Sequence, residues 1–250
     1  MPERRPVSAF LAEATVSTEI AELRPDYRAL LVVAQGLTPG TSDEVSDALL
    51  SRAEAAATAR LAANTVEELP HVAAWRDAYR AFGAKPQRTR NSLEALTRRA
   101  PSGLPRVNRL TDVYNAISVL HQLPIGGEDL DRYVGSPRLL RATGTEPFDT
   151  TADGADVIDH AEPREVVWCD DLGVTCRRWN WRQGRRTALG EDTTDAVFIL
   201  DALEPMTEDA LRAAATDLTD HLRRLGPDVH VTDRLLHASA PRPTDPPELS

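Results

Sequence analysis

The chain has 250 residues, of which 41% are hydrophobic and 27% are charged; this balance can bury a core and excludes a wholly disordered chain. Its net charge of −10 argues against attraction of the whole surface to nucleic acid or to an anionic membrane. The longest apolar run, Ala29 to Ala34, is far below the ~18 residues of a membrane span, and Glu3, Glu13 and Glu19 interrupt any signal-peptide pattern. We therefore expect a soluble cytoplasmic protein with no membrane partner.

The first half of the chain is predicted to be mainly helical. An apolar, β-branched run bounded by Pro25 and Gly36 predicts one buried strand, and capping residues and 3.6-residue periodicity predict the helices around it. In chain order these elements are a short helix Val7–Ala14, the strand Tyr27–Ala34, and helices over Thr41–Ala63 (capped by Ser42 or Asp43), His71–Phe82, Asn91 or Ser92 to Arg99, and Asp112–Gln122.

After about residue 136 the pattern changes to strands. The segment Asp170 to Gly173 has the composition of a turn and predicts a hairpin between its neighbours. The elements are strands Arg138–Ala142, Glu165–Cys169, Val174–Trp179 and Ala196–Leu200, a helix capped by Thr207, and a short strand Val229–Val231. We interpret the chain as α+β, with one composite domain over residues 1–240 and a disordered proline-rich tail over 241–250.

The cysteines and histidines do not predict a metal site. Cys169 and Cys176 flank the predicted hairpin turn, and we expect two reduced, half-buried thiols there rather than a disulfide. The six histidines are scattered, with no HxxxH or HxH pair. We expect neither a metal nor a cofactor.

Positive charge is concentrated in two segments of this acidic chain. Arg76 to Arg109 has nine basic residues against two acidic ones, and Arg164 to Arg186 has six arginines against three acidic residues. Each segment is either an ordinary solvated face or a surface for an anionic ligand.

Polar residues recur at helical spacing near the middle of the chain. Asn108, Asp112 and Asn115 are four and three positions apart, which places them on one face of a helix. Asn and Asp side chains compete with the helix backbone for hydrogen bonds. Three of them on one face therefore indicate either caps and a buried polar network or the wall of a polar pocket.

The segment CRRWNW combines arginine with tryptophan. Strand alternation assigns its residues to two faces, one with Cys176, Arg178 and Asn180 and the other with Arg177, Trp179 and Trp181. Arginine beside tryptophan suits a ligand with a π face and a phosphate, such as single-stranded nucleic acid or an aminoacyl adenosine. The alternative is that the tryptophans are core residues along which the arginines extend to solvent.

Four segments resemble the B3/B4 domain of the phenylalanyl-tRNA synthetase beta chain, and more closely its free-standing homologues. They are Trp75 through AFGAKPQRTRNSLEAL, then LPRVNRLTDVYNAISVLHQLPIGGEDLDRY, VVWCDDLGVTCRRWNWRQGRRT and TTDAVFILDAL. The likeness covers residues 70–204 and implies a mixed sheet or small barrel with flanking helices. It also implies a site where the ester of a mischarged tRNA is hydrolysed. Asn108, Asp112 and Asn115 match the family's N-x-x-x-D-x-x-N segment, which favours the pocket wall.

The chain departs from the family's pattern at two places. Gly126 stands where the family has its editing histidine, in a Gly126–Gly127 pair that by itself predicts a turn. The family's Gly-Gly-Glu segment, which reads a tyrosine hydroxyl, is absent near Trp179 to Arg182. Tyrosine specificity is therefore not carried over, and we interpret the site as a variant. The sequence has no nucleotide-binding motif, so we expect no phenylalanylation by this chain.

The preferred hypothesis is a stand-alone deacylase that acts in trans on mischarged aminoacyl-tRNA, with the tRNA acceptor end as partner and a synthetase as a further partner that could deliver it. Asp112 would pair with the α-ammonium group, and the glycine pair would make room and donate N–H groups to the oxyanion. The expected catalytic residues are Asn108, Asp112, Asn115, Gly126 and Gly127. The expected substrate-binding residues are Lys85, Arg88 and Arg90 on phosphates, Arg178 and Asn180 on the opposing wall, Trp179 or Trp181 in stacking, and Arg106 and Asp129.

Two alternatives remain open. An RNA-binding module without hydrolytic activity would bind tRNA in a salt-sensitive way, whatever amino acid it carries. A pocket for an amino-acid-like metabolite would use no RNA, and the basic segments would then be plain surface.

Overall fold

The computed structural model describes residues 6–238. Its helices are α1 (Val7–Ala12), α2 (Thr18–Leu23), α3 (Glu44–Leu61), α4 (Pro70–Ala81), α5 (Ser92–Arg99), α6 (Arg109–His121) and α7 (Glu208–Arg223). Its strands are β1 (Thr15–Val16), β2 (Arg28–Gln35), β3 (Ile125–Asp129), β4 (Arg138–Arg141), β5 (Pro147–Ala152), β6 (Ala155–His160), β7 (Val166–Cys169), β8 (Val174–Arg177), β9 (Arg182–Gln183), β10 (Ala196–Ala202) and β11 (His230–His237).

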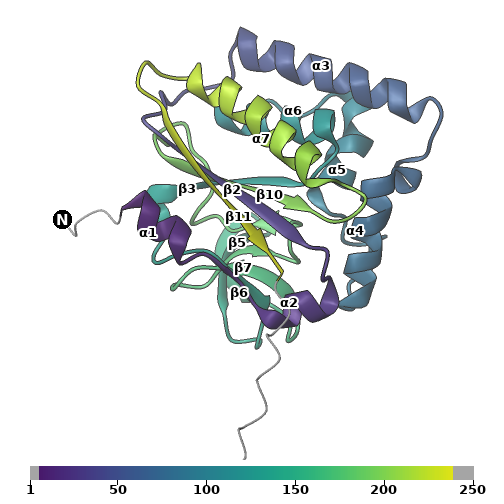
Figure 1. Cartoon of the computed structure of the whole chain (residues 1–250), viewed down its shortest axis with the longest axis vertical. Helices are drawn as coiled ribbons and strands as arrows, with labels where there is room; N and C mark the ends of the chain where they lie inside the picture. The colour runs from purple at the N-terminus through teal and green to yellow at the C-terminus, as the bar shows by residue number, and fades with distance from the viewer. Residues whose placement is uncertain (1–5, 239–250) are drawn as a thin grey trace, which may run out of the picture.

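An antiparallel sheet of four strands, in the order β11-β2-β10-β3, organises the core. Strand β2 is an apolar run that is buried along its length, so both faces of the sheet are covered. Leu30 and Val32 face the helices α3, α6 and α7, which lie together over one side of the sheet (Figure 1). Leu31 and Val33 alternate with them and belong to the core on the other side.

A second sheet of five strands, in the order β1-β4-β7-β8-β9, covers that other side. The layer between the two sheets is rich in aromatic rings: Trp75, Trp168 and Trp179 are each at most 1% exposed. Trp75 and Trp179 pack edge to face with ring centroids 5.2 Å apart. The candidate site lies in this layer.

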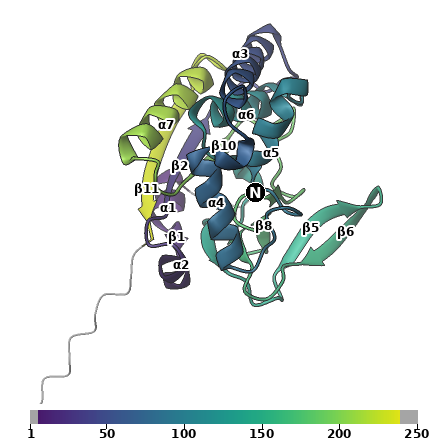
Figure 2. The same cartoon turned by 90° about the vertical axis from the view of Figure 1, so that its right-hand side faces the viewer.

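Strands β5 and β6 form a separate hairpin that extends away from the body of the molecule (Figure 2). Phe148 attaches the hairpin to a small core cluster, whereas Ile158 on the other strand is 61% exposed. The sequence predicts no strand here. Strand β6 buries none of its residues, so the alternation that would have predicted it is missing.

The predicted α+β class is confirmed, and none of the sheets formed by residues 6–238 is closed into a barrel. The predicted helices are confirmed with shifted ends, and Asp43 is the residue that caps α3. The hairpin around Asp170 to Gly173 is confirmed as β7–β8. Within the described range, no helix is long and apolar enough to cross a membrane.

Three local predictions need correction. The pair Gly126–Gly127 is not a turn but the middle of β3, and the predicted strand Val174–Trp179 ends at Arg177. Cys169 and Cys176 are free but fully rather than half buried. The predicted disordered tail, 241–250, lies outside the described residues.

Candidate active site

A cavity of about 220 Å³ opens between the two sheets beside the edge strand β3. Its walls come from α5, α6, β3, β10 and the segment from β7 to β9. Most of the lining is apolar or aromatic, with Leu96, Ile125, Trp168, Trp179, Trp181 and Ile199. Pockets for drug-sized ligands measure roughly 300–1,000 Å³. This smaller cavity therefore suits one small chemical group rather than a whole nucleotide.

Three polar side chains in the wall have unused hydrogen-bonding capacity. Asn115 on α6 is 8% exposed, and its amide bonds to no other residue in the described part of the chain. The Ser92 hydroxyl at the start of α5 is buried and also unpartnered there. Gln183 Nε2 donates to the Gly127 carbonyl oxygen (2.9 Å), which leaves Gln183 Oε1 available. Since buried polar groups are normally paired, Asn115 and the Ser92 hydroxyl indicate a polar ligand, and the half-buried Gln183 can add an acceptor.

Two buried carboxyl groups also line the cavity. Glu128 on β3 accepts a hydrogen bond from the Tyr133 hydroxyl, and burial raises the pKa of Glu128 to about 7. Asp201 on β10 accepts from Tyr27 (2.6 Å) and Asn180 (3.2 Å), and burial raises its pKa to about 7 as well. Both groups can hold a proton near neutral pH.

Sequence reasoning missed these two carboxyl groups. In a strand, Ile125 and Glu128 point to opposite faces of the sheet. This pattern is visible only once Gly126–Gly127 is recognised as part of a strand. Asp201 lies near the end of a strand, where an acidic residue does not by itself indicate a functional site.

The turn after β8 brings Asn180 and Trp181 to the cavity. Positive φ values at Arg178 (47°) and Trp179 (69°) turn the chain, so the predicted alternation of faces is wrong. Trp179 lines the cavity as a fully buried core residue, whereas Trp181 is only half buried. Asn180 Oδ1 accepts from the Tyr79 hydroxyl (2.9 Å). Trp181 is therefore the ring with a surface available for stacking.

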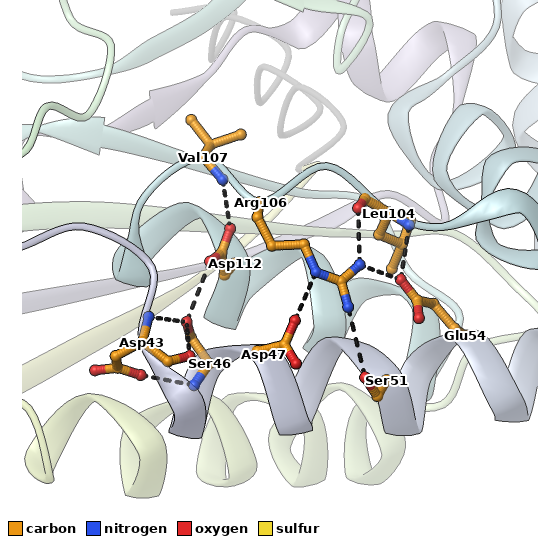
Figure 3. A network of polar contacts seen from close by, with 9 residues as sticks. All are labelled: Asp43, Ser46, Asp47, Ser51, Glu54, Leu104, Arg106, Val107 and Asp112. Carbon is orange, nitrogen blue, oxygen red and sulfur yellow. Dashed lines mark hydrogen bonds and ion pairs between the residues drawn. The ribbon is translucent and has the colours of Figure 1, made fainter.

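Asp112 belongs instead to a buried network that fixes the start of α6 against α3 (Figure 3). Its Oδ1 accepts from the Val107 backbone N–H (2.9 Å) and its Oδ2 from the Ser46 hydroxyl (3.1 Å). The side chain is fully buried and does not line the cavity. The geometry corrects the assignment of Asp112 to an α-ammonium group and favours the structural alternative.

Arg106, Asn108 and Asp129 also have structural partners and lie outside the cavity wall. Arg106 pairs with two carboxylates of α3, as Figure 3 shows. Asn108 caps α6 by accepting from the Thr111 N–H (2.8 Å), and Asp129 accepts from the Thr193 hydroxyl (2.7 Å). Their contact with substrate stays a prediction, and the structure shows for each of them a structural role.

The glycine pair lies in the middle of β3, where its two N–H groups point in opposite directions. On the same strand, Pro124 accepts from Asp201 N–H (3.1 Å) and Leu130 donates to Asp195 O (3.0 Å). Alternate residues of an antiparallel strand bond to the same neighbour, so Gly126, midway in this series, directs its N–H toward β10. The Gly126 N–H therefore faces β10 rather than an oxyanion, and the predicted donor role stays a prediction for the Gly127 N–H, which points away from β10. A Cβ at Gly127 would lie 2.9 Å from Leu189 and 2.9 Å from Tyr114, which lines the cavity.

The predicted phosphate contacts divide into two groups. Lys85 and Arg88 line a second cavity together with Arg178, whereas Arg90 lies at the start of α5, 3.6 Å from Glu94. Several other basic residues of the two segments pair with carboxylates, namely Arg76 with Glu94, Arg106 with Asp47 and Glu54, Arg177 with Glu165 and Asp159, Arg185 with Asp149 and Asp156, and Arg186 with Asp170. No group of three His, Cys, Asp or Glu side chains among residues 6–238 is arranged to hold a metal ion.

The structure is an α+β domain with a cavity between two open sheets. The chain belongs to the B3/4 domain family, because the family model for the B3/4 domain matches residues 74–225. This match confirms the resemblance drawn from the sequence.

A similar solved structure is an N-terminal fragment of the phenylalanyl-tRNA synthetase beta-subunit from Pyrococcus horikoshii. The two are 12% identical with a TM-score of 0.44, over 89% of this chain and 50% of the fragment. The chain thus spans about half the length of that fragment. A search of curated proteins finds no match.

Proposed function

We propose that this protein is a trans-acting aminoacyl-tRNA deacylase, which hydrolyses the ester between an amino acid and the 3′-terminal ribose of a mischarged tRNA. Water adds to the ester carbonyl carbon, the bond to the ribose oxygen breaks, and that oxygen leaves with a proton. The products are a free amino acid and uncharged tRNA. Such a substrate implies a cytoplasmic location and a synthetase as the source of mischarged tRNA.

The observation that carries the proposal is the unpartnered Asn115 amide in the wall of a cavity sized for one small group. An amide can donate to a developing oxyanion and accept from an ammonium group, the two polar features of an aminoacyl ester. Ser92 and Gln183 add polar atoms to the same wall. The family resemblance supports the choice of an aminoacyl-tRNA over other esters.

The test is amino-acid release from a panel of mischarged tRNAs, each labelled on the amino acid. Asn115→Leu removes the amide while keeping most of its volume. We expect this variant to lose about 100-fold in kcat/KM, since the loss of one oxyanion donor costs about 2.7–4 kcal/mol of transition-state stabilisation. Asn64→Leu is the control, because Asn64 is exposed and bonds only to the Arg60 carbonyl oxygen (3.1 Å).

Equal rates for the parent and a folded Asn115→Leu protein would refute the assignment of the site. If no tRNA releases its amino acid, and uncharged tRNA binds in a salt-sensitive way, the chain is an RNA-binding module and the proposal fails.

A further inference from the structure

A second cavity, of about 400 Å³, lies on the other side of the Arg178–Trp181 pair from the first. Arg178 lines the second cavity and Trp181 lines the first, and the guanidinium carbon of Arg178 is 4.6 Å from the centroid of the Trp181 ring. One member of this stacked pair therefore lines each cavity.

The cations of the second cavity differ from those of the rest of the molecule. Lys85 and Arg88 lie on the loop between α4 and α5, are exposed, and form no ion pair with any of residues 6–238. Most other arginines of the two basic segments are already neutralised by carboxylates. Two unpaired cations that line one concave surface indicate an anionic ligand.

Arg178 is held in place before any ligand binds. Its guanidinium donates to the Thr89 hydroxyl and stacks on Trp181. Its nearest carboxylate, Glu165, is 3.7 Å away and is already held by two hydrogen bonds from Arg177 (2.9 and 2.8 Å). Arg178 therefore keeps donors for an anion.

Two acidic residues line the same cavity. Glu165 is paired with Arg177, whereas Glu162 is exposed, with no basic partner for its carboxylate in the described part of the chain. Lys85, Arg88 and Arg178 outnumber the two acidic residues. The net charge of the residues that line the cavity is therefore positive. Removing the negative charge of Glu162 would make it more positive.

We propose that the second cavity binds the 5′-phosphate of the nucleotide whose acyl group enters the first cavity. Guanidinium, ammonium and hydroxyl donors are the groups that recognise phosphate. The stacked pair between the cavities places the nucleoside across Trp181. This inference rests on the proposed function for the identity of the acyl group, but the phosphate site can be tested without hydrolysis.

The test is calorimetric titration of the full chain with adenosine 5′-monophosphate and with adenosine. We expect the monophosphate to bind at least tenfold more tightly than adenosine. In a Lys85→Gln/Arg88→Gln variant the two affinities should become equal within about twofold. The control is Arg212→Gln/Arg223→Gln, with the same loss of charge on exposed positions of α7. Glu162→Gln should strengthen binding of the monophosphate only.

An unchanged preference for the monophosphate in the Lys85/Arg88 variant would overturn the inference. So would competition by inorganic phosphate at the same concentration as the monophosphate, because the site would then take free phosphate rather than a nucleotide. A phosphate preference without amino-acid release from any tRNA would refute only the proposed function. Release that is indifferent to Lys85 and Arg88 would refute only the phosphate site.

Discussion

Glu128 is a carboxyl group in a layer of aromatic and apolar side chains. It is 1% exposed, and its nearest partners are the hydroxyl groups of Tyr133 and Thr175 rather than a cation. Asp170 adds negative charge nearby and Arg186 partly offsets it. Burial therefore favours the protonated form, which can donate a hydrogen bond toward the cavity.

This burial makes the stability of the protein depend on pH. The pKa of Glu128 is about 7 in the fold against 4.5 ordinarily, so between these values the native state binds more protons than the unfolded state. The free energy of unfolding should then fall as pH rises from 4.5 to 7. In Glu128→Gln this fall should be smaller by about 3 kcal/mol, which denaturant titrations at several pH values would measure.

A matched variant separates this effect from general changes in charge. Glu191→Gln removes a carboxyl group from an exposed loop position and should leave the pH dependence of the parent unchanged. Parallel curves for Glu128→Gln and the parent would show that Glu128 is ionised like an ordinary glutamate.

The sequence predicts which helix face a site residue occupies, but not which neighbouring element covers it. Spacing alone placed Asn115 and Asp112 on one helix face, and the structure separates them. Asp112 is near the helix start, where α3 and the preceding loop cover it, whereas Asn115 lies further along and meets the cavity. Which neighbour covers each turn of a helix is a tertiary property, so the sequence could not distinguish the two.

At the scale of elements, the start of α6 depends on a contact made by a distant helix. Asp112 receives one hydrogen bond from the Val107 backbone and one from Ser46 on α3, and all these groups are removed from solvent except part of Val107. Removing the carboxylate would leave the Val107 N–H without a partner, whereas the Ser46 hydroxyl could still donate to the Asp43 carbonyl oxygen (3.1 Å).

We expect Asp112→Ala to lower the free energy of unfolding by about 1–3 kcal/mol, since one orphaned donor costs about that much. At temperatures where it remains folded, it should keep the kcat/KM of the parent. Asp47→Ala on α3 breaks only an exposed ion pair with Arg106 and should cost at most about 1 kcal/mol. Loss of activity in a fully folded Asp112→Ala protein would contradict this structural role and would show that Asp112 acts in the site.

Helices and central strands were predictable because their signals are local. Asn91 and Thr207 cap α5 and α7 through their own side chains, and β2 is apolar throughout. Strand β9 has two residues, and the hairpin β5–β6 buries little, so neither has a pattern of its own. The turn after β8 depends on positive φ values at Arg178 and Trp179. A sequence does not indicate such values at residues other than glycine.

At the scale of the whole molecule, the clustering of arginine in the sequence overstates the positive surface. Many of these arginines are paired with carboxylates from other segments, as Arg177 is with Glu165 and Arg186 with Asp170. The unpaired cations at the second cavity, Lys85 and Arg88, are a small part of a chain with a net charge of −10. Sequence analysis identified the segments, but only the fold shows which of their charges are available.

The walls of the first cavity come from segments near residues 92, 115, 126, 180 and 200, so the cavity exists only when the whole fold is assembled. A ligand that fills it therefore binds the native state alone and raises the melting temperature. At 100 times its Kd, a non-hydrolysable aminoacyl-adenosine should add about 2.7 kcal/mol, or roughly 5–10 °C. A melting screen of such analogues should rank amino acids by fit, and the ranking should disappear in Asn115→Leu. A flat screen with the parent protein would mean that the cavity does not accept an aminoacyl group.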